Sequence, residues 1–249
     1  MINKEEIAVQ DKVSEYYEGT RYKVEYAKMY HDWWIKKMIS MVNVRKGSVI
    51  LDNGCGTGIL FDYLDKYNCR TIGFDISKGM IEKSRKSNKP LICGDSRFLP
   101  FKEKTFDVIF ARSLLHHLPD PKKGIEEMKR IVKNNGKIIL ADTNNSILSR
   151  LPRKIAKKGE HFSEDHKNFG FAELLNIVDS GFKVTDIYFF GYIAYPLLGF
   201  PDLIGVYKYF PLKNYFAKIL IRIDEIVSKI PYIKRCSWGV MVCAIKSND

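Results

Sequence analysis

The chain has 249 residues, of which 45% are hydrophobic and 28% charged, a balance typical of a soluble globular protein with an ample core. Its net charge of +12 favours an anionic partner, namely nucleic acid, an anionic membrane surface or an acidic substrate, unless it reflects only a lysine-rich composition. Five cysteines without a C-x-x-C pair argue against a disulfide framework or zinc site, and the charged start MINKEEIAVQDK lacks a secretory core, so we expect a cytoplasmic protein.

Residues 1–46 are expected to be helical and are unusually rich in aromatic side chains. These are Tyr16, Tyr17, Tyr22, Tyr26, Tyr30, Trp33 and Trp34. One interpretation is that the aromatic stripe packs on the core of the protein. The other is that this segment covers a ligand site.

The next stretch, Val49–Gly58, reads VILDNGCGTG. An apolar run that ends in an acid and is followed by three alternating glycines predicts a buried strand turning sharply into a helix that starts near Thr57. Glycine is needed where φ is positive or where a ligand lies against the main chain. We therefore expect the amides of Gly54, Gly56 and Gly58, with the start of that helix, to face a ligand.

Strands and helices then alternate, which favours a parallel α/β sheet. The expected strands are 70–76, 90–94, 106–111 and 137–142, and the expected helices 78–86 and 121–132, the second closed by Asn134, Asn135 and Gly136. Ligands of such sheets bind at the carboxyl ends of the strands. Asp75, at the end of its strand, should therefore meet the glycine turn in one crevice.

The C-terminal part holds a helix at 171–180, a strand at 183–190 and a last strand at 238–245, so residues 191–237 form an insertion. Pro196 and Pro201 interrupt its apolar first half and argue against a membrane span. Its second half is a helix from near Asn214 with an apolar stripe and several cations. This helix either docks its stripe on the core or rests on an anionic membrane surface.

Two further segments lie between the fifth and sixth strands. The run 149–158 carries five cations and no acid, on the expected substrate side of the sheet. His161, Glu164, Asp165 and His166 do not have the spacing of a metal site, so no metal is expected, and His161 or His166 is a candidate substrate contact.

Five motifs occur in the order and spacing of one family. They are LDNGCGTG (51–58), GFDIS (73–77), GDSRFLPF (94–101), FDVIFARSLLHHL (106–118) and KRIVKNNGKIILAD (129–142). On these motifs the chain resembles the class I S-adenosylmethionine-dependent methyltransferases, in their small-molecule, type 11-like branch. The resemblance implies a Rossmann-like α/β fold with a seven-stranded sheet of order 3-2-1-4-5-7-6 and an antiparallel strand seven. It also implies an N-terminal helical lid at 1–46 and a core at 47–249, with 191–237 as an acceptor-side insertion.

The resemblance further implies S-adenosyl-L-methionine as the cofactor. It assigns Asp75 to the ribose hydroxyls and Asp95 and the Ser96 amide to the adenine. Asp52 and Asn53 would lie near the methionine end, although Asn53 stands where the family commonly has an apolar residue. The whole expected cofactor set is Asp52, Asn53, Gly54, Gly56, Gly58, Asp75, Ile76, Met80, Asp95, Ser96, Arg112 and Tyr17.

The loop after the fourth strand bears on the acceptor. It lacks the N/D/S-P-P-aromatic sequence of enzymes that methylate nucleic-acid bases, so nucleic acid is not the expected partner. His116 and His117 are candidate catalytic bases for an oxygen acceptor, and because they are adjacent at most one should reach the substrate. The alternative is that they only pack or cap.

These observations favour methyl transfer to a hydrophobic or amphipathic small molecule, such as a quinone-like, lipid-linked or polyketide-like acceptor, with oxygen preferred over nitrogen or carbon. One alternative is an RNA or protein methyltransferase, and another is a cofactor-binding protein without turnover. A peripheral position on the inner membrane face is an alternative to the cytoplasm. The oligomeric state stays open.

Overall fold

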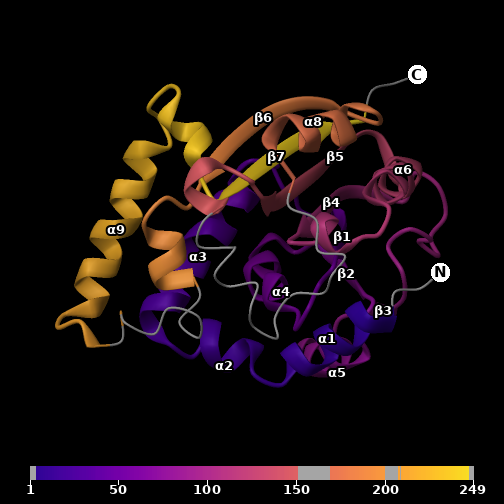
Figure 1. Cartoon of the computed structure of the whole chain (residues 1–249). Coiled ribbons are helices and arrows are strands. Elements are labelled where there is room, and N and C mark those ends of the chain that lie inside the picture. The colour runs from indigo at the N-terminus through magenta and orange to yellow at the C-terminus, as the bar shows by residue number, and fades with distance from the viewer. Residues whose placement is uncertain (1–3, 151–168, 200–206, 208, 247–249) are drawn as a thin grey trace.

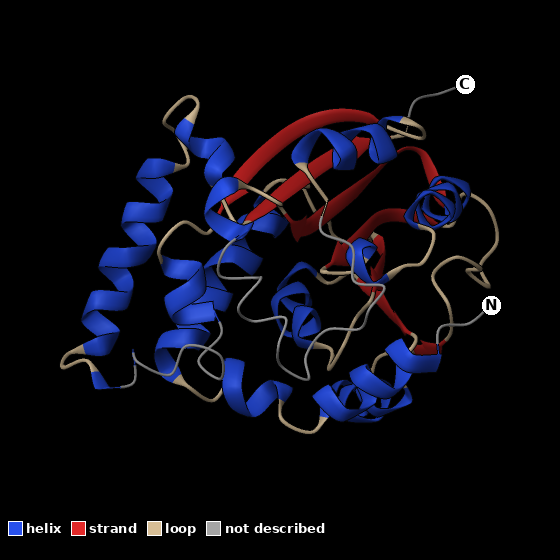
Figure 2. Cartoon of the chain, in the orientation of Figure 1, coloured by secondary structure: helices blue, strands red, loops and turns tan. Residues whose placement is uncertain are grey.

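The computed structural model describes residues 4–150, 169–199, 207 and 209–246, and a sheet runs through its centre with helices on both faces (Figures 1 and 2). The strands are β1 (Val49–Asn53), β2 (Arg70–Asp75), β3 (Leu91–Cys93), β4 (Phe106–Arg112), β5 (Val132–Thr143), β6 (Lys183–Phe190) and β7 (Gly239–Ile245). Their order is β3-β2-β1-β4-β5-β7-β6, and β7 runs antiparallel to both β5 and β6. The predicted fold and sheet order are confirmed.

The helices begin and end where local chemistry allows. They are α1 (Lys4–Ser14), α2 (Tyr17–Arg21), α3 (Glu25–Ser40), α4 (Ile59–Leu64), α5 (Lys78–Ser84), α6 (Pro121–Ile131), α8 (Phe171–Asp179) and α9 (Lys213–Val227), with short turns η1 (Asp65–Tyr67), η2 (Arg85–Ser87), η3 (Leu115–His117), η4 (Tyr195–Gly199) and η6 (Ile233–Cys236). The Ser77 hydroxyl caps α5 by accepting the Met80 amide at 3.1 Å. Asp120 caps α6, and Pro121 stands at the first turn, where no amide is needed.

Two hydrophobic clusters hold the layers together. On one face of the sheet, Met128 of α6 and Leu174 of α8 pack with residues of β4, β5 and β7. On the other, Tyr30 and Met38 of α3 pack with Ile139 of β5 and with the start of the insertion. The sheet is therefore covered on both sides, as its nearly continuous apolar strands require.

The aromatic residues near the N-terminus divide between two roles. Tyr26, Tyr30 and Trp34 of α3 are buried, and Trp34 stacks on Phe190 with a centroid separation of 5.9 Å. The packing interpretation is thus confirmed for α3. The rings carried by α2 and its end stay half-buried and belong to the site described below.

One strand boundary differs from the expectation. Residues 134–136 do not close a helix but lie inside β5, which begins directly after α6. Val132 pairs with Phe106, and Lys137 pairs with Val108, so β5 uses three more residues than β4 over this interval. A bulge absorbs them, with Asn135 at a φ of 59°. The asparagines and glycine that suggested a turn serve the bulge instead.

The helix α9 forms an outer edge of the molecule (Figure 1). Its buried residues are Ala217, Ile221 and Asp224. Of the apolar stripe that was expected to dock, Leu220 and Val227 pack against the core clusters, while Ile219 is 38% and Ile226 57% exposed. The docking interpretation is therefore confirmed for one side of the stripe and wrong for the other.

A buried carboxylate ties α9 to the start of the insertion. Asp224 accepts hydrogen bonds from the amides of Tyr192 and Ile193 at 2.9 Å and of Ala194 at 3.3 Å. Burial raises the pKa of Asp224, and these amides oppose the rise. No helix within the described residues is long and apolar enough to cross a membrane.

We predict that Asp224→Ala lowers the free energy of unfolding by about 2–4 kcal/mol, because three backbone amides lose their acceptor in a buried setting. Glu225→Ala is the matched control on the same helix. Its carboxylate accepts only the Trp33 indole N–H, so its loss should cost about 1 kcal/mol or less. Urea denaturation followed by circular dichroism measures both, and equal losses would contradict the prediction.

Candidate functional site

The glycine turn after β1 has the backbone conformation that only glycine adopts freely. The φ angles are 77° at Gly54, 55° at Gly56 and 81° at Gly58. A Cβ at Gly58 would lie 2.3 Å from the Ser84 hydroxyl oxygen, so this glycine is required for packing against α5. A Cβ at Gly56 would meet nothing nearer than the Met80 sulfur at 4.0 Å, which leaves its outer side open.

The amides of this turn are used differently from the expectation. Gly54 N donates to Phe74 O at 2.8 Å, Gly56 N to the Asp75 carboxylate at 2.8 Å, and Gly58 N to Cys55 O at 3.0 Å. The amides of Gly54 and Gly56 therefore hold the turn against the end of β2, and the amide of Gly58 closes the turn on itself, instead of facing a ligand. α4 begins at Ile59, two residues later than expected.

Asp75 joins the turn to the end of β2, so the expected convergence is present. One carboxylate oxygen accepts the Gly56 amide and the other accepts the Ser77 amide at 2.9 Å. Burial raises the pKa of Asp75, while these two hydrogen bonds oppose the rise. The carboxyl group is thus oriented on both sides by backbone.

Asp52 lies fully buried beneath the turn. Among the described residues neither carboxylate oxygen has a hydrogen-bond partner, and Arg112 forms an ion pair with Asp52 through its Nη2, 3.5 Å away. Burial raises the pKa of Asp52 to about 6, with Arg112 lowering it and Asp75 adding to the rise. The Nε of Arg112 also lacks a hydrogen-bond partner. This pair therefore keeps unused hydrogen-bonding capacity next to the turn.

The residues expected at the adenine end are already bonded to each other and to a neighbour. Ser96 donates its hydroxyl to the Asn53 carbonyl oxygen at 2.7 Å, while Asn53 Nδ2 has no partner. Arg97, which the motifs did not single out, pairs with Asp95 at 2.6 Å. Burial would raise the pKa of Asp95, but the hydrogen bonds from Arg97 outweigh it and lower the pKa. Met80 is buried beneath Gly56, and Ile76 is half-buried.

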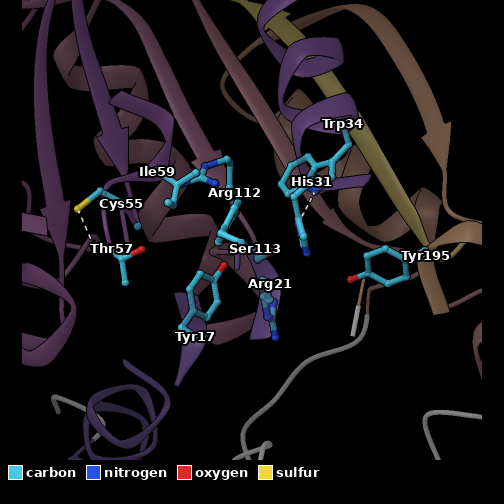
Figure 3. A pocket seen from close by; sticks show the side chains of 13 residues that line it. Tyr17, Arg21, His31, Trp34, Cys55, Thr57, Ile59, Arg112, Ser113 and Tyr195 are labelled. Atoms are coloured by element: carbon cyan, nitrogen blue, oxygen red, sulfur yellow. Dashed lines mark hydrogen bonds between the residues drawn. The ribbon is translucent and has the colours of Figure 1, made fainter. Parts of the chain in front are cut away.

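A pocket of about 50 Å³ opens between the glycine turn and the N-terminal helices (Figure 3). Figure 3 shows Cys55 and Thr57 on one side and His31, Trp34 and Tyr195 on the other. Residues of α2, α3, the glycine turn, α4, β4, η4 and adjoining loops line it: Tyr17, Arg21, Tyr22, His31, Trp34, Gly54, Cys55, Gly56, Thr57, Ile59, Arg112, Ser113 and Tyr195. Of the expected cofactor set, Tyr17, Gly54, Gly56 and Arg112 are among them.

Several lining residues carried no signal in the motifs. Arg21, with its guanidinium 4.6 Å from the centre of the Tyr17 ring, and Tyr195 come from segments outside the five motifs. Thr57 lies inside a motif, but its buried hydroxyl without a partner is visible only in the structure. Tyr22 lies beside Arg112, and burial raises the pKa of its phenol.

His31 is neutral and fully engaged. Its Nδ1 accepts a hydrogen bond from the Trp34 indole at 3.0 Å, and its Nε2 donates to the Gly199 carbonyl at 3.2 Å. Burial and the nearby Arg21 lower the pKa of His31 to about 3. The ring therefore ties α3 to η4 across the pocket.

The two histidines proposed as bases lie on η3, outside the pocket lining. His116 Nδ1 lies 2.5 Å from an oxygen of Asp142, and His117 Nδ1 lies 2.8 Å from Glu6 of α1. The two rings lie with their centroids 4.1 Å apart and their planes tilted by 42°. Burial would raise the pKa of Asp142, but His116 outweighs it and lowers the pKa. Their role as a base stays a prediction.

The first helix closes over the adenine side of the crevice. Asp11 accepts the Gly79 amide at 3.0 Å and the Ser77 hydroxyl at 2.5 Å, which joins α1 to the start of α5 (Figure 1). Glu18 of α2 pairs with Lys86 at 2.6 Å. The N-terminal segment thus contacts both the start of α5 and the turn η2 that follows α5.

The described residues contain no group of three metal-ligating side chains. His161, Glu164, Asp165, His166 and most of the basic run at 149–158 lie outside the residues that the structure describes.

Comparison with known proteins assigns this site to a family. Residues 51–140 match the family described as a methyltransferase domain. This part of the chain is a class I S-adenosylmethionine-dependent methyltransferase domain. The match to this family implies S-adenosylmethionine as the cofactor of the domain.

Among curated relatives, a demethylmenaquinone methyltransferase of Corynebacterium urealyticum is 30% identical over 115 residues, which cover 46% of this chain and 50% of the relative. The chain thus spans about half the length of the curated relatives it matches.

Solved structures share the fold over more of the chain. One is a protein from the Haloferax volcanii complex with the Trm112 methyltransferase activator, with a TM-score of 0.65 and 19% identity over 96% of this chain and 98% of that one. Another is Haemonchus contortus phosphoethanolamine N-methyltransferase 2 with S-adenosylmethionine, with a TM-score of 0.60 and 15% identity over 86% of this chain and 52% of that one.

The residues of the methyltransferase domain fit this cofactor. Buried hydrogen-bonding atoms of Asp52, Asn53, Thr57 and Arg112 lack partners, and they surround the turn whose Gly56 leaves room for a ligand. Unpaired buried polar atoms are costly, so a ligand that satisfies them gains affinity.

We predict that Asp75→Ala weakens S-adenosylmethionine binding by at least about 100-fold, because an ionised acceptor that the backbone orients is lost. Asp75→Asn keeps most of the shape and should weaken binding less. Asp65→Ala, an exposed acid paired with Lys89, is the matched control and should leave the affinity unchanged. Isothermal titration calorimetry measures all three, and wild-type affinity in Asp75→Ala would remove Asp75 from the site.

We also predict that wild-type affinity for S-adenosylmethionine falls about tenfold for each pH unit below about 6. Asp52 has its pKa raised to about 6, so it is ionised above that pH and neutral below it. Protonation removes the charge that attracts the cofactor's ammonium group. Asp52→Asn should bind weakly at neutral pH and lack this step. Titrations at several pH values check this, and an identical step in the variant would assign it to another group.

Proposed function

We propose that this chain transfers a methyl group from S-adenosylmethionine to a hydrophobic or amphipathic small molecule. The observation that carries the proposal is the pocket that joins the glycine turn to a wall of aromatic side chains. A cofactor held at the turn would present its reactive end to a small space lined by aromatic rings and by polar groups such as Arg21 and Ser113. Such a space suits a small amphipathic acceptor better than a nucleotide or an extended peptide.

The protein's own contribution is to bind and align the two reactants. Asp75, oriented by the Gly56 and Ser77 amides, would hold the ribose, and Asp52 with Arg112 would meet the methionine end. When bound, the cofactor supplies a methyl group already activated by a sulfonium. Alignment and exclusion of water therefore account for most of the rate gain that the protein has to provide.

The N-terminal segment would act as the lid. Asp11 and Glu6 attach α1 to α5 and to His117, and α2 carries Tyr17 into the pocket. The Tyr17 ring beside the turn is suited to a cation–π contact with the sulfonium, worth about 0.5–2 kcal/mol. Residues 1–46 would thus complete the site as well as cover it.

The side of the pocket opposite the glycine turn indicates which acceptors would fit. Tyr22, Trp34 and Tyr195 offer flat apolar surface, and Arg21 offers one cation for a polar or anionic head group. A quinone-like molecule has this combination. The relatives named demethylmenaquinone methyltransferases, which align over about half their length, support the same acceptor class.

The choice between oxygen, nitrogen and carbon rests on the need for a base. An oxygen acceptor, the preferred prediction, gains from one, and His116 or His117 would have to reach it. His31 is the histidine that lines the pocket, and both of its ring nitrogens are engaged. Product analysis decides this point directly.

The test is a transfer assay with S-adenosylmethionine labelled in its methyl group. We expect label in a demethylmenaquinone with a short isoprenoid tail, and none in transfer RNA or added protein. Label in RNA or protein would favour the first alternative, and cofactor binding without any transfer would favour a protein without turnover. Mass-spectrometric fragmentation of the product identifies the methylated atom.

We predict that Tyr195→Ala raises the KM for the quinone about tenfold, because one aromatic face of the pocket is lost. The Kd for S-adenosylmethionine should not change. Tyr67→Ala removes a ring from η1, outside the pocket lining, and is the matched control. A KM that stays at the wild-type value would place the acceptor elsewhere.

A further inference from the structure

The outward side of α9 is apolar, although the helix lies on the surface of the protein. Tyr215 is 63% exposed, Ile219 38% and Ile226 57%. At 3.6 residues per turn these three positions fall within a sector of about 40°, opposite the buried Ala217 and Ile221. The stripe is therefore continuous along the helix and has no partner in the described chain.

Cations border this stripe on one side. Lys218 and Arg222, four residues apart and both exposed, lie next to each other along the helix. The two acids of α9 are both engaged away from the stripe: the buried Asp224 accepts backbone amides of the insertion, and the half-buried Glu225 accepts the Trp33 indole at 2.9 Å. The outward side of α9 thus combines apolar and cationic groups without an acid.

The apolar side chains continue past both ends of the helix. Leu212 precedes it and is 75% exposed, and Tyr232 follows it and is 90% exposed. Both have positive φ angles, 50° and 67°, which bulky residues rarely adopt. The helix itself is about 22 Å long at 1.5 Å per residue. The exposed residues of the helix and of its two ends are here named the α9 surface: Leu212, Tyr215, Lys218, Ile219, Arg222, Ile226 and Tyr232.

We propose that the α9 surface binds to an anionic lipid bilayer, with its apolar side chains at the level of the head groups. Apolar residues flanked by lysine and arginine are the combination by which amphipathic helices rest on membranes. The net charge of +12 adds a long-range attraction to the same surface. The charge pattern is complementary to anionic lipid and to little else that is flat and wide.

A second copy of the chain is a poorer occupant. A two-fold dimer through the α9 surface would bring Lys218 and Arg222 toward their own copies, and α9 offers no outward acid to neutralise them. An anionic bilayer has the opposite charge and needs no matched shape.

Binding of the α9 surface to a bilayer would also explain how a hydrophobic acceptor reaches the pocket. Asp224 of α9 holds the amides of residues 192–194, and the next residue, Tyr195, lines the pocket. The membrane contact and the pocket are thus built on one tethered segment. A hydrophobic acceptor dissolved in lipid would be delivered next to its site. This last link rests on the proposed function, whereas binding to vesicles does not.

The test is co-sedimentation of the full chain with vesicles of phosphatidylglycerol and phosphatidylcholine, compared with phosphatidylcholine alone. We expect binding only to the anionic vesicles, and weaker binding at about 1 M than at about 0.1 M salt, where screening lengths are about 3 and 10 Å. S-adenosylmethionine titration of the same samples reports the cofactor site separately. The two proposals therefore fail in distinguishable ways.

Two matched pairs of variants locate the surface. Lys218→Glu with Arg222→Glu should weaken vesicle binding at least tenfold, while Lys46→Glu with Lys102→Glu, which changes net charge equally at exposed sites outside α9, should weaken it much less. Ile226→Gln should weaken binding about tenfold, and Phe98→Gln, at an apolar position that is slightly more exposed, should not. Thermal melting confirms that each variant is folded.

Three results would overturn the proposal. The first is no binding of the wild type to anionic vesicles. The second is binding that the α9 variants reduce no more than their controls, because the contact would then lie elsewhere. The third is a dimer, or a complex with an added protein, that Ile226→Gln disrupts while vesicle binding is absent, which would make the α9 surface a protein interface.

Discussion

The hydrogen bond from the Gly56 amide to the Asp75 carboxylate is the contact on which the rest of the site depends. It fastens the turn after β1 to the end of β2, and the Ser77 amide on the other oxygen fixes where α5 begins. Since burial alone disfavours the charged form of Asp75, the two amides are what keep a carboxylate in place there. The positions of Asp52, Met80 and Arg112 follow from this anchored turn.

A second constraint comes from the N-terminal helices, which combine packing with site building. α3 contributes rings to the core, and His31 on the same helix reaches across to Gly199 through a neutral imidazole. That contact fixes the far wall of the pocket to the insertion. α1, in contrast, is attached mainly by polar groups, Asp11 and Glu6, which can separate at a lower cost than a buried aromatic cluster. A firmly packed α3 and a more loosely attached α1 would allow the N-terminal segment to open for a ligand without unfolding.

Two acidic residues of α9, Asp224 and Glu225, hold the insertion against the rest of the protein. Asp224 accepts hydrogen bonds from backbone amides, and Glu225 accepts one from the Trp33 indole. Neither carboxylate lies in the outward stripe of α9, which presents cations and apolar groups. The same two residues therefore decide both how the helix is held and what charge it presents. Because Asp224 is buried against backbone amides, its negative charge does not reach the outward side of α9.

Patterns along the chain were sufficient for the fold and for the main chemistry of the site. Alternating strands and helices, the glycine turn and Asp75 at a strand end predict an α/β sheet with a ligand crevice, because each depends on local periodicity or backbone conformation. The order of the strands in the sheet came from the resemblance of the five motifs, in their order and spacing, to one family. Tertiary structure alone decided where the turn's amides point, since their acceptors, Phe74 and Asp75, lie on a different strand. It alone brought Arg21, His31 and Tyr195 to one pocket, because they are up to 174 positions apart and share no motif. It alone decided which part of the apolar stripe of α9 faces outward, because helical periodicity shows that a stripe exists but only packing against α3 shows which side is buried.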